Sequence, residues 1–177
     1  GADPLPAMTE SLQKLLVCGA DCLLIPCNTA HYFLPPLQAQ TQVPFLDITQ
    51  VSAQACRDRF PGQTAAVLAT TGTLSVGLYQ HALTEAGVPF LLPDEREQKM
   101  LMEVIYDGVK AGRPPEVYEE GMRAVLTGLT SRGADYFILA CTELPLAAEA
   151  LALAEPTIDP TEELARAAIR FCGYRVK

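Results

Sequence analysis

Long apolar runs, clusters of basic residues and low-complexity segments are all missing from this sequence. The longest apolar stretches, such as residues 136–141, fall far short of the roughly 20 residues that a membrane-spanning helix needs. Residues 1–20 lack a basic start followed by an apolar block, so no export signal is visible. Thirteen basic residues against twenty-one acidic ones give a net charge of −8. We therefore expect neither nucleic acid nor a membrane surface as a partner.

Cysteine is too sparse for a disulfide-stabilised scaffold. The chain has six cysteines in 177 residues, which predicts reduced thiols and a cytoplasmic protein. Cys18, Cys22 and Cys27 lie close together, but neither a C-x-x-C motif nor a nearby pair of histidines completes four metal ligands. We therefore expect no metal site. With 49% hydrophobic and 19% charged residues, the composition is typical of a globular chain with one domain or two small lobes.

Short apolar runs alternate with longer amphipathic stretches along the chain. The apolar runs predict strands at residues 22–26, 43–47, 65–69, 88–92, 136–140 and 157–159. The spacing of apolar residues predicts helices at 4–17, 30–40, 50–59, 74–86, 95–110, 116–132 and 161–171. This alternation indicates an α/β fold with mainly parallel sheets that are flanked by helices.

An internal repeat relates two parts of the chain. A Gly-Ala-Asp segment at residues 19–21 leads through a predicted strand to Cys27, and the same three residues at 133–135 lead to Cys141 with the same spacing. Further along, a Pro-x-x-Asp-x-Thr pattern follows each cysteine, and the spacing differs by only two residues between the copies. We therefore expect two pseudo-symmetric lobes, each with a cysteine at the end of a strand.

The second copy is longer than the first. Its strand at residues 65–69, the following turn and two further helices have no counterpart in the first copy, because that counterpart would lie before residue 1. Relative to a full duplication, roughly fifty residues are missing. We therefore expect the first lobe to be incomplete.

The two repeated cysteines lie where α/β proteins bind their ligands. In an open parallel sheet, ligands lie beyond the carboxyl ends of the strands, and the N-termini of the following helices face them. A helix N-terminus also favours a thiolate over a thiol. If the lobes face each other, one sulfur can remove a proton from a carbon and the other can return one to the opposite side. The alternative is that Cys27 and Cys141 are buried core residues.

The motifs Cys27-Asn-Thr-Ala-His31 and Cys141-Thr-Glu-Leu-Pro145 resemble the paired signatures of the aspartate/glutamate racemase superfamily, and particularly of its aspartate racemase branch. Supporting similarities occur at residues 69–73 (ATTGT), at Ser75 and Tyr79, at 108–112 (GVKAG) and at 156–160 (PTIDP). Glutamate racemases typically have Ser in place of His31 and His in place of Glu143. The resemblance covers nearly the whole chain.

This resemblance implies an isomerase, a racemase that acts on an amino acid, most simply aspartate, without pyridoxal phosphate or another cofactor. Cys27 and Cys141 would be the catalytic acid/base residues, with no covalent intermediate. The residues expected to bind the substrate are Asn28, Thr29, Thr70, Thr73, Lys110, Thr142 and Glu143. The threonines could also be helix caps, and Lys110 could be a solvated lysine at a helix end. We interpret His31 as structural.

The resemblance further implies a homodimer and a division into lobes, with residues 1–45 and 156–177 in the first lobe and 46–155 in the second. Complete members of the superfamily begin with a strand, a glycine-rich turn and an arginine that binds a substrate carboxylate. Because these features are not in this sequence, we expect an incomplete part of a longer protein, the alternative being a defective paralogue. Other activities left open are those of a broad-specificity or hydantoin racemase, a maleate isomerase and a non-catalytic remnant.

Overall fold

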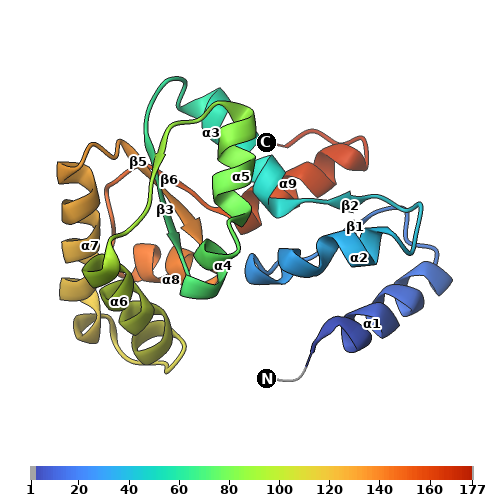
Figure 1. Ribbon diagram of the computed structural model, residues 1–177, viewed down its shortest axis with the longest axis horizontal. Coiled ribbons are helices and arrows are strands. Elements are labelled where there is room, and N and C mark those ends of the chain that lie inside the picture. Colours follow the sequence, from blue (N-terminus) through green and yellow to red (C-terminus); the bar gives the residue numbers. More distant parts are fainter. Residues whose placement is uncertain (1–2, 177) are drawn as a thin grey trace.

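The computed structural model describes residues 3–176 and contains two parallel sheets flanked by helices (Figure 1). The smaller sheet pairs β1 (Leu23–Leu24) with β2 (Phe45–Leu46). The larger sheet has the strand order β4-β3-β5-β6 and consists of β3 (Ala65–Ala69), β4 (Phe90–Leu91), β5 (Tyr136–Ala140) and β6 (Thr157–Ile158). Because each pairing is parallel, the predicted α/β fold is confirmed.

The helices cover these sheets as the apolar periodicity predicts. The α-helices are α1 (Leu5–Val17), α2 (Leu34–Gln38), α3 (Ile48–Arg59), α4 (Thr71–Ser75), α5 (Leu78–Ala86), α6 (Glu95–Glu103), α7 (Glu119–Ser131), α8 (Glu143–Ala150) and α9 (Pro160–Phe171). Two short 3₁₀ helices, η1 (Thr29–Phe33) and η3 (Pro115–Val117), and one π-helix, η2 (Val104–Val109), complete them. Within residues 3–176, no helix has the length and apolarity needed to cross a bilayer.

The sequence repeat is also a structural repeat. Leu24 of β1 pairs with Leu46, and Ile138 of β5 pairs with Ile158, so each motif cysteine follows its strand in the same register. After β2, Asp47 caps α3 by accepting a hydrogen bond from a backbone N–H at 2.8 Å, and Asp159 caps α9 at the same distance. The two copies therefore share strand register and helix capping as well as sequence.

The segment at residues 156–177 begins in the larger sheet and continues in a helix that contacts both sheets. We expected residues 156–177 to belong to the first lobe, and in the structure β6 pairs with β5 at an edge of the larger sheet. In the second copy of the repeat, β6 pairs with the preceding strand β5, just as β2 pairs with β1 in the first copy. The next helix, α9, packs on α3 and also contacts β2 and β5, so it joins the two sheets. Residues 1, 2 and 177 of the expected first lobe lie outside the described residues.

Two predicted helices are interrupted, each for a local reason. The helix expected at 74–86 is divided into α4 and α5 by Gly77, which has a φ of 74° that favours glycine. The helix expected at 30–40 begins as η1 and restarts as α2. Pro35 and Pro36 lie in the first turn of α2, where their missing N–H donors leave no hydrogen bond broken.

The central strands β3 and β5 are buried along their whole length, with apolar clusters on both faces. Leu68 and Phe137 face a cluster formed with α6, α7 and α8, whereas Val67 and Ile138 face one formed with α3 and α5. Alternate residues of a strand point to opposite faces, which explains why both strands are apolar throughout. The core therefore fixes the carboxyl ends of β3 and β5.

A close approach behind η2 makes Gly108 a test of this packing. A Cβ at Gly108 would lie 2.6 Å from Cδ1 and 3.0 Å from Cβ of the buried Tyr118. We predict that Gly108→Ala lowers the free energy of unfolding by about 1–3 kcal/mol through overpacking, as measured by urea unfolding followed by circular dichroism.

Gly121→Ala is the matched control, because its Cβ would make an ordinary contact at 3.6 Å with Val104. Within helix α7 this change should be neutral or stabilising by up to about 1 kcal/mol. Equal effects of the two substitutions would contradict the packing argument.

Candidate active site

The residues that follow three strands come together at the carboxyl ends of the sheets. Ala69 of β3 pairs with Ala140 of β5, so Thr70 and Cys141 leave the larger sheet from neighbouring positions. Cys27 follows β1 of the smaller sheet. Each of these ends leads into a helix, α4, α8 or η1, as expected for a ligand site in an α/β fold.

These segments surround a small cavity of about 80 Å³. It is lined by the motif cysteines and by neighbouring residues from both lobes, most of which are polar: Cys27, Asn28, Thr29, Thr70, Tyr106, Lys110, Ala140, Cys141, Thr142 and Glu143. Of the site residues expected from the sequence, only Thr73 does not line this cavity.

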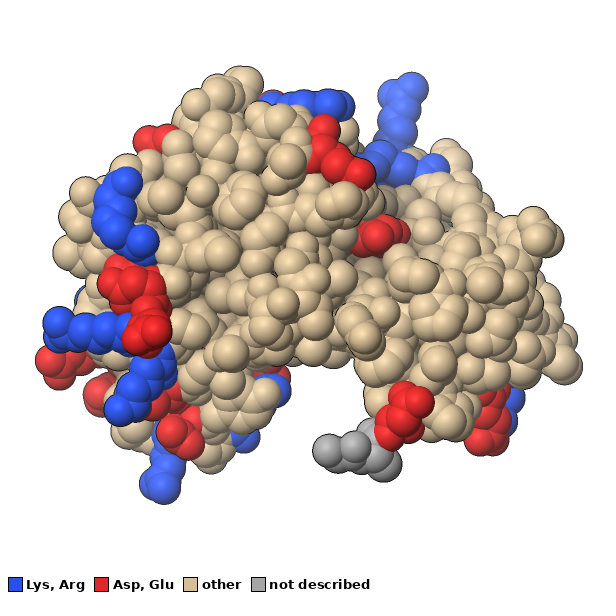
Figure 2. All heavy atoms as spheres, in the orientation of Figure 1, with Lys and Arg blue, Asp and Glu red and all other residues tan. Residues whose placement is uncertain are grey.

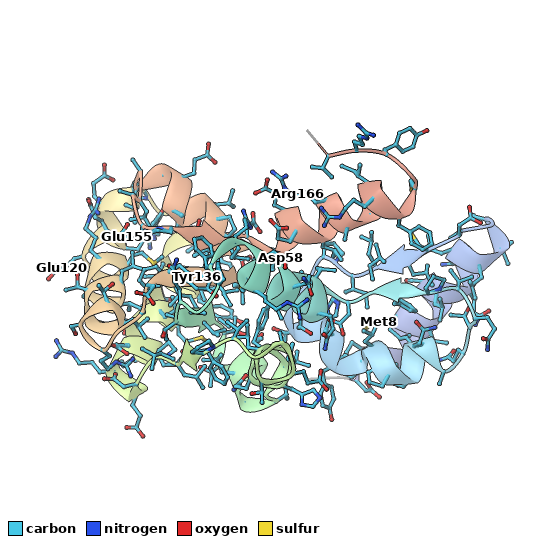
Figure 3. The ribbon with its side chains drawn as sticks, turned by 90° about the horizontal axis from the view of Figure 1, so that it is seen from above. Met8, Asp58, Glu120, Tyr136, Glu155 and Arg166 are labelled. Atoms are coloured by element: carbon cyan, nitrogen blue, oxygen red, sulfur yellow. The ribbon has the colours of Figure 1, made fainter. Side chains whose placement is uncertain are left out.

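A much wider groove, of about 770 Å³, lies between α3 and α9. Asp58 and Arg166, which line it, are labelled in Figure 3. None of its lining residues belongs to either cysteine motif. Size alone therefore does not identify the site, and we base the assignment on the chemistry of the lining residues.

His31 connects the Cys27 segment to the start of α3 through hydrogen bonds of its ring. Its Nδ1 lies 3.0 Å from the carbonyl oxygen of Cys27, and its Nε2 accepts a hydrogen bond from the backbone N–H of Ile48 at 3.1 Å. Since Nε2 is the acceptor, Nδ1 carries the proton and donates it to the carbonyl. Burial lowers the pKa of His31, which keeps the ring neutral. These contacts agree with a structural role for His31.

Three threonine hydroxyls connect the lobes at the wall of the cavity. The hydroxyl of Thr29 lies 2.7 Å from that of Thr73 and 3.3 Å from that of Thr70, which are themselves 3.1 Å apart. Thr70 also caps α4 by accepting a hydrogen bond from the backbone N–H of Thr73. Thr73 is fully buried, so it supports Thr29 and Thr70 from behind.

The two sulfurs differ in their surroundings. Cys27 is exposed, whereas Cys141 is buried and its thiol donates a hydrogen bond of 2.9 Å to Oε2 of Glu143. Burial, followed by this hydrogen bond, raises the pKa of Cys141 to about 12. Burial opposes ionisation of Glu143, but hydrogen bonds from Cys141 and Thr142 and the charge of Lys110 lower its pKa overall. Near neutral pH, Cys141 is therefore a thiol beside a carboxylate.

Lys110 places one positive charge at the cavity. Its Nζ lies 3.8 Å from Oε1 of Glu143 and 4.4 Å from the centre of the Tyr106 ring. Tyr106 was not expected from the sequence, although its position one helical turn before Lys110 is a signal that could have identified it. It lies in η2, which ends just before Lys110, and π-helical turns frequently occur at functional sites.

The remaining cysteines do not contribute to this cavity, and all six are free thiols. Among residues 3–176, no three side chains of His, Cys, Asp or Glu are grouped in a way that could hold a metal ion. The donors and acceptors that face a ligand here are thiol, hydroxyl, amide, carboxylate and ammonium groups.

Two parallel sheets flanked by helices, with a cysteine that follows a strand of each sheet on one polar cavity, are typical of two-lobed α/β enzymes whose ligand lies beyond the strand ends. Residues 1–168 match the family model described as Asp/Glu/Hydantoin racemase. The chain belongs to this family, which confirms the resemblance seen in the cysteine motifs, and it is a racemase, an enzyme of the isomerase class.

Individual relatives agree with this assignment. The broad specificity amino-acid racemase RacX of Bacillus subtilis is 27% identical over 165 residues, which cover 92% of this chain and 70% of RacX. The aspartate racemase of Picrophilus torridus superimposes with a TM-score of 0.81 at 26% identity, covering 100% of this chain and 73% of its own. Glutamate racemase from Francisella tularensis in complex with D-glutamate shares the fold, with a TM-score of 0.72 at 17% identity and coverage of 93% and 62%.

The neutral state of His31 predicts a stability that depends on pH. The pKa of His31 in the folded chain lies below its unfolded value of about 6.5, so the unfolded chain binds the proton more readily. The stabilising contribution of the neutral ring is therefore lost as the pH falls from the unfolded pKa through the folded pKa. We predict that His31→Gln lowers the free energy of unfolding by about 1–3 kcal/mol at neutral pH. This loss should shrink at acid pH, as measured by urea unfolding between pH 7.5 and pH 5.

His81→Gln provides the matched control, because His81 is the other histidine of the chain and its side chain is exposed on α5. In that variant, the free energy of unfolding should fall at acid pH as it does in the unmodified chain. If the free energy of unfolding of His31→Gln fell by the same amount at acid pH, the buried imidazole would not be the cause of this fall.

The Cys141–Glu143 contact makes a prediction about thiol reactivity. A carboxylate that accepts the thiol hydrogen bond stabilises the protonated form, so Glu143→Gln should lower the pKa of Cys141. Alkylation of Cys141 by iodoacetamide, located by mass spectrometry, should then begin at a lower pH. Glu149→Gln, an exposed position on the same helix, should leave the profile unchanged. An unshifted profile for Glu143→Gln would show that burial alone sets this pKa.

Proposed function

We propose that this chain racemises aspartate by moving the α-proton between Cys27 and Cys141. The observation that carries the proposal is that the two sulfur-bearing residues come from different lobes and line the same cavity. Membership of the racemase family supports the chemistry, and the similarity to the Picrophilus torridus aspartate racemase supports the substrate.

The proposed proton transfer uses one thiolate and one thiol. The Cys27 thiolate removes the α-proton, so that an S–H bond forms as the Cα–H bond breaks and the electron pair is delocalised into the substrate carboxylate. The Cys141 thiol then gives its proton to the opposite face of the carbon and becomes a thiolate. In the reverse direction, the Cys141 thiolate removes the α-proton as the Cα–H bond breaks, and the Cys27 thiol gives its proton to the opposite face of the carbon. No electron is gained or lost in either direction.

Local donors have to attract an anionic substrate against the net charge of −8. In the view of Figure 2, charged side chains of both signs gather over α6 and α7, and much of the remaining face is uncharged. Within the cavity, we propose that Lys110 binds one substrate carboxylate and that the amide and hydroxyl groups bind the other. Glu143 would face the substrate ammonium. The proposed binding residues are Asn28, Thr29, Thr70, Lys110, Thr142 and Glu143, with Thr73 behind them.

Two further expectations stay predictions. A homodimer follows from the resemblance, and apolar side chains exposed near the end of α9, such as Phe171 and Tyr174, are available for burial by a second copy. A reducing, cytoplasmic environment follows from cysteine usage, and the six free thiols are compatible with it.

Replacing either motif cysteine tests the mechanism. We predict that Cys27→Ser and Cys141→Ser each reduce exchange of the aspartate α-proton in D₂O by at least about 100-fold, because each removes an acid/base group. Proton NMR follows the loss of the α-proton signal. Cys172→Ser is the matched control, since Cys172 is exposed at the end of α9 and should be dispensable. Full activity in either motif variant would contradict the two-thiol mechanism.

The same assay tests the substrate. A panel of L-amino acids that includes aspartate and glutamate should show exchange with aspartate. Broad exchange would instead favour the activity named for the Bacillus subtilis relative, and would reject aspartate specificity while retaining the chemistry. Exchange with no amino acid of the panel would contradict the proposed function.

A further inference from the structure

One side-chain amide of the cavity has a hydrogen-bond partner for its oxygen but none for its nitrogen. Asn28 is 3% exposed and lines the cavity, and its Oδ1 accepts a hydrogen bond of 2.5 Å from the hydroxyl of Tyr79. Its Nδ2 is buried and has no partner among residues 3–176. A buried donor without a partner is destabilising, so a ligand that supplies an acceptor would be bound more tightly here.

Asn28 differs from the other buried side chains that have an unpaired polar atom. Those described in the structure are Gln80, Gln98, Tyr136 and Glu155, and none of them lines the cavity. The incomplete hydrogen bonding of Asn28 is therefore associated with the site and is not a general feature of the core.

Tyr79 determines which end of the Asn28 amide remains available. Its side chain is fully buried in the cluster between the larger sheet and helices α3 and α5. Burial raises the pKa of its phenol, so the hydroxyl keeps its proton and acts as a donor. Because a donor needs an acceptor, the amide oxygen turns toward Tyr79, and the two N–H groups are left for a ligand.

We propose that Tyr79 is a positioning residue that orients the Asn28 amide so that its N–H groups bind a carboxylate of the substrate. This inference rests on the proposed function and deepens it, because it adds a residue that does not line the cavity. An amide held in this way donates to carboxylate oxygens and cannot accept from the substrate ammonium. Tyr79 thereby helps to decide which group of an amino acid occupies this part of the cavity.

A double-mutant cycle tests this coupling. We compare the unmodified 177-residue chain with Tyr79→Phe, Asn28→Ala and the double variant, and measure KM and kcat for aspartate by α-proton exchange. Tyr79→Phe should raise KM about 2- to 10-fold, as expected for one hydrogen bond, and should leave kcat and its pH profile nearly unchanged. Asn28→Ala should raise KM at least as much, and the double variant should bind no more weakly than Asn28→Ala.

Tyr136→Phe is the matched control for loss of a buried hydroxyl. Tyr136 is also fully buried, lies within the larger lobe (Figure 3), and has a hydroxyl with no partner among the described residues. It starts β5, at the opposite end of that strand from Cys141. Tyr136→Phe should leave KM unchanged, and thermal unfolding of all variants separates effects on binding from loss of the fold.

Two outcomes would overturn the inference. One is an unchanged KM in Tyr79→Phe, and the other is a further increase when Tyr79→Phe is added to Asn28→Ala, because Tyr79 would then act independently of the amide. Calorimetric titration with succinate, an unreactive dicarboxylate, separates this question from catalysis. If the unmodified chain exchanges no α-proton but Tyr79→Phe weakens succinate binding as described, the proposed function fails and the positioning role stands. If the unmodified chain binds no succinate, the positioning role fails as well.

Discussion

The candidate site depends on buried polar contacts that hold the Cys27 segment against the larger lobe. The strands of the smaller sheet are only two residues long, so their pairing fixes little beyond β1 and β2. The position of the Cys27 segment is fixed instead by hydrogen bonds. They join His31 to the backbone of Ile48, Asn28 to Tyr79, and the hydroxyl of Thr29 to α4. Polar contacts with little solvent access restrict geometry strongly, because a displaced group would lose its partner without gaining water. The placement of one sulfur is thus determined by residues of the other lobe.

Duplication gives the two cysteines equivalent positions, but their environments make them chemically different. Cys141 follows a fully buried strand and donates to Glu143, whereas Cys27 follows a short strand and is exposed. The proposed proton transfer needs one group that begins as an acid and one that begins as a base, and unlike surroundings of the two sulfurs are compatible with it. Tyr106 lies in η2 and Lys110 follows directly after it, and both line the cavity.

Much of the fold could be predicted because strong local patterns determine it. The continuous apolar runs at 65–69 and 136–140 coincide with β3 and β5, since strands buried on both faces carry few polar residues. Less could be predicted where backbone geometry overrides periodicity. Gly77 divides one expected helix, Pro35 and Pro36 divide another, and the helix expected at 95–110 ends as a π-helix. Sequence order alone does not state which neighbour the strand at 157–158 pairs with, and the structure pairs it with β5.

The sequence by itself determined which residues are candidates for chemistry, since two cysteine motifs at matching points of a repeat are visible without coordinates. It also determined the α/β class and the family, because apolar periodicity and motif order are properties of the chain alone. Only the tertiary structure decided that Tyr106 lines the cavity, that Thr73 lies behind it, and that Glu143 accepts a hydrogen bond from Cys141. It likewise decided the link from Tyr79 to Asn28, two residues that are far apart in sequence. Burial, pKa and hydrogen-bond partners depend on which segments are neighbours in space, and the packing of the whole chain determines these neighbours.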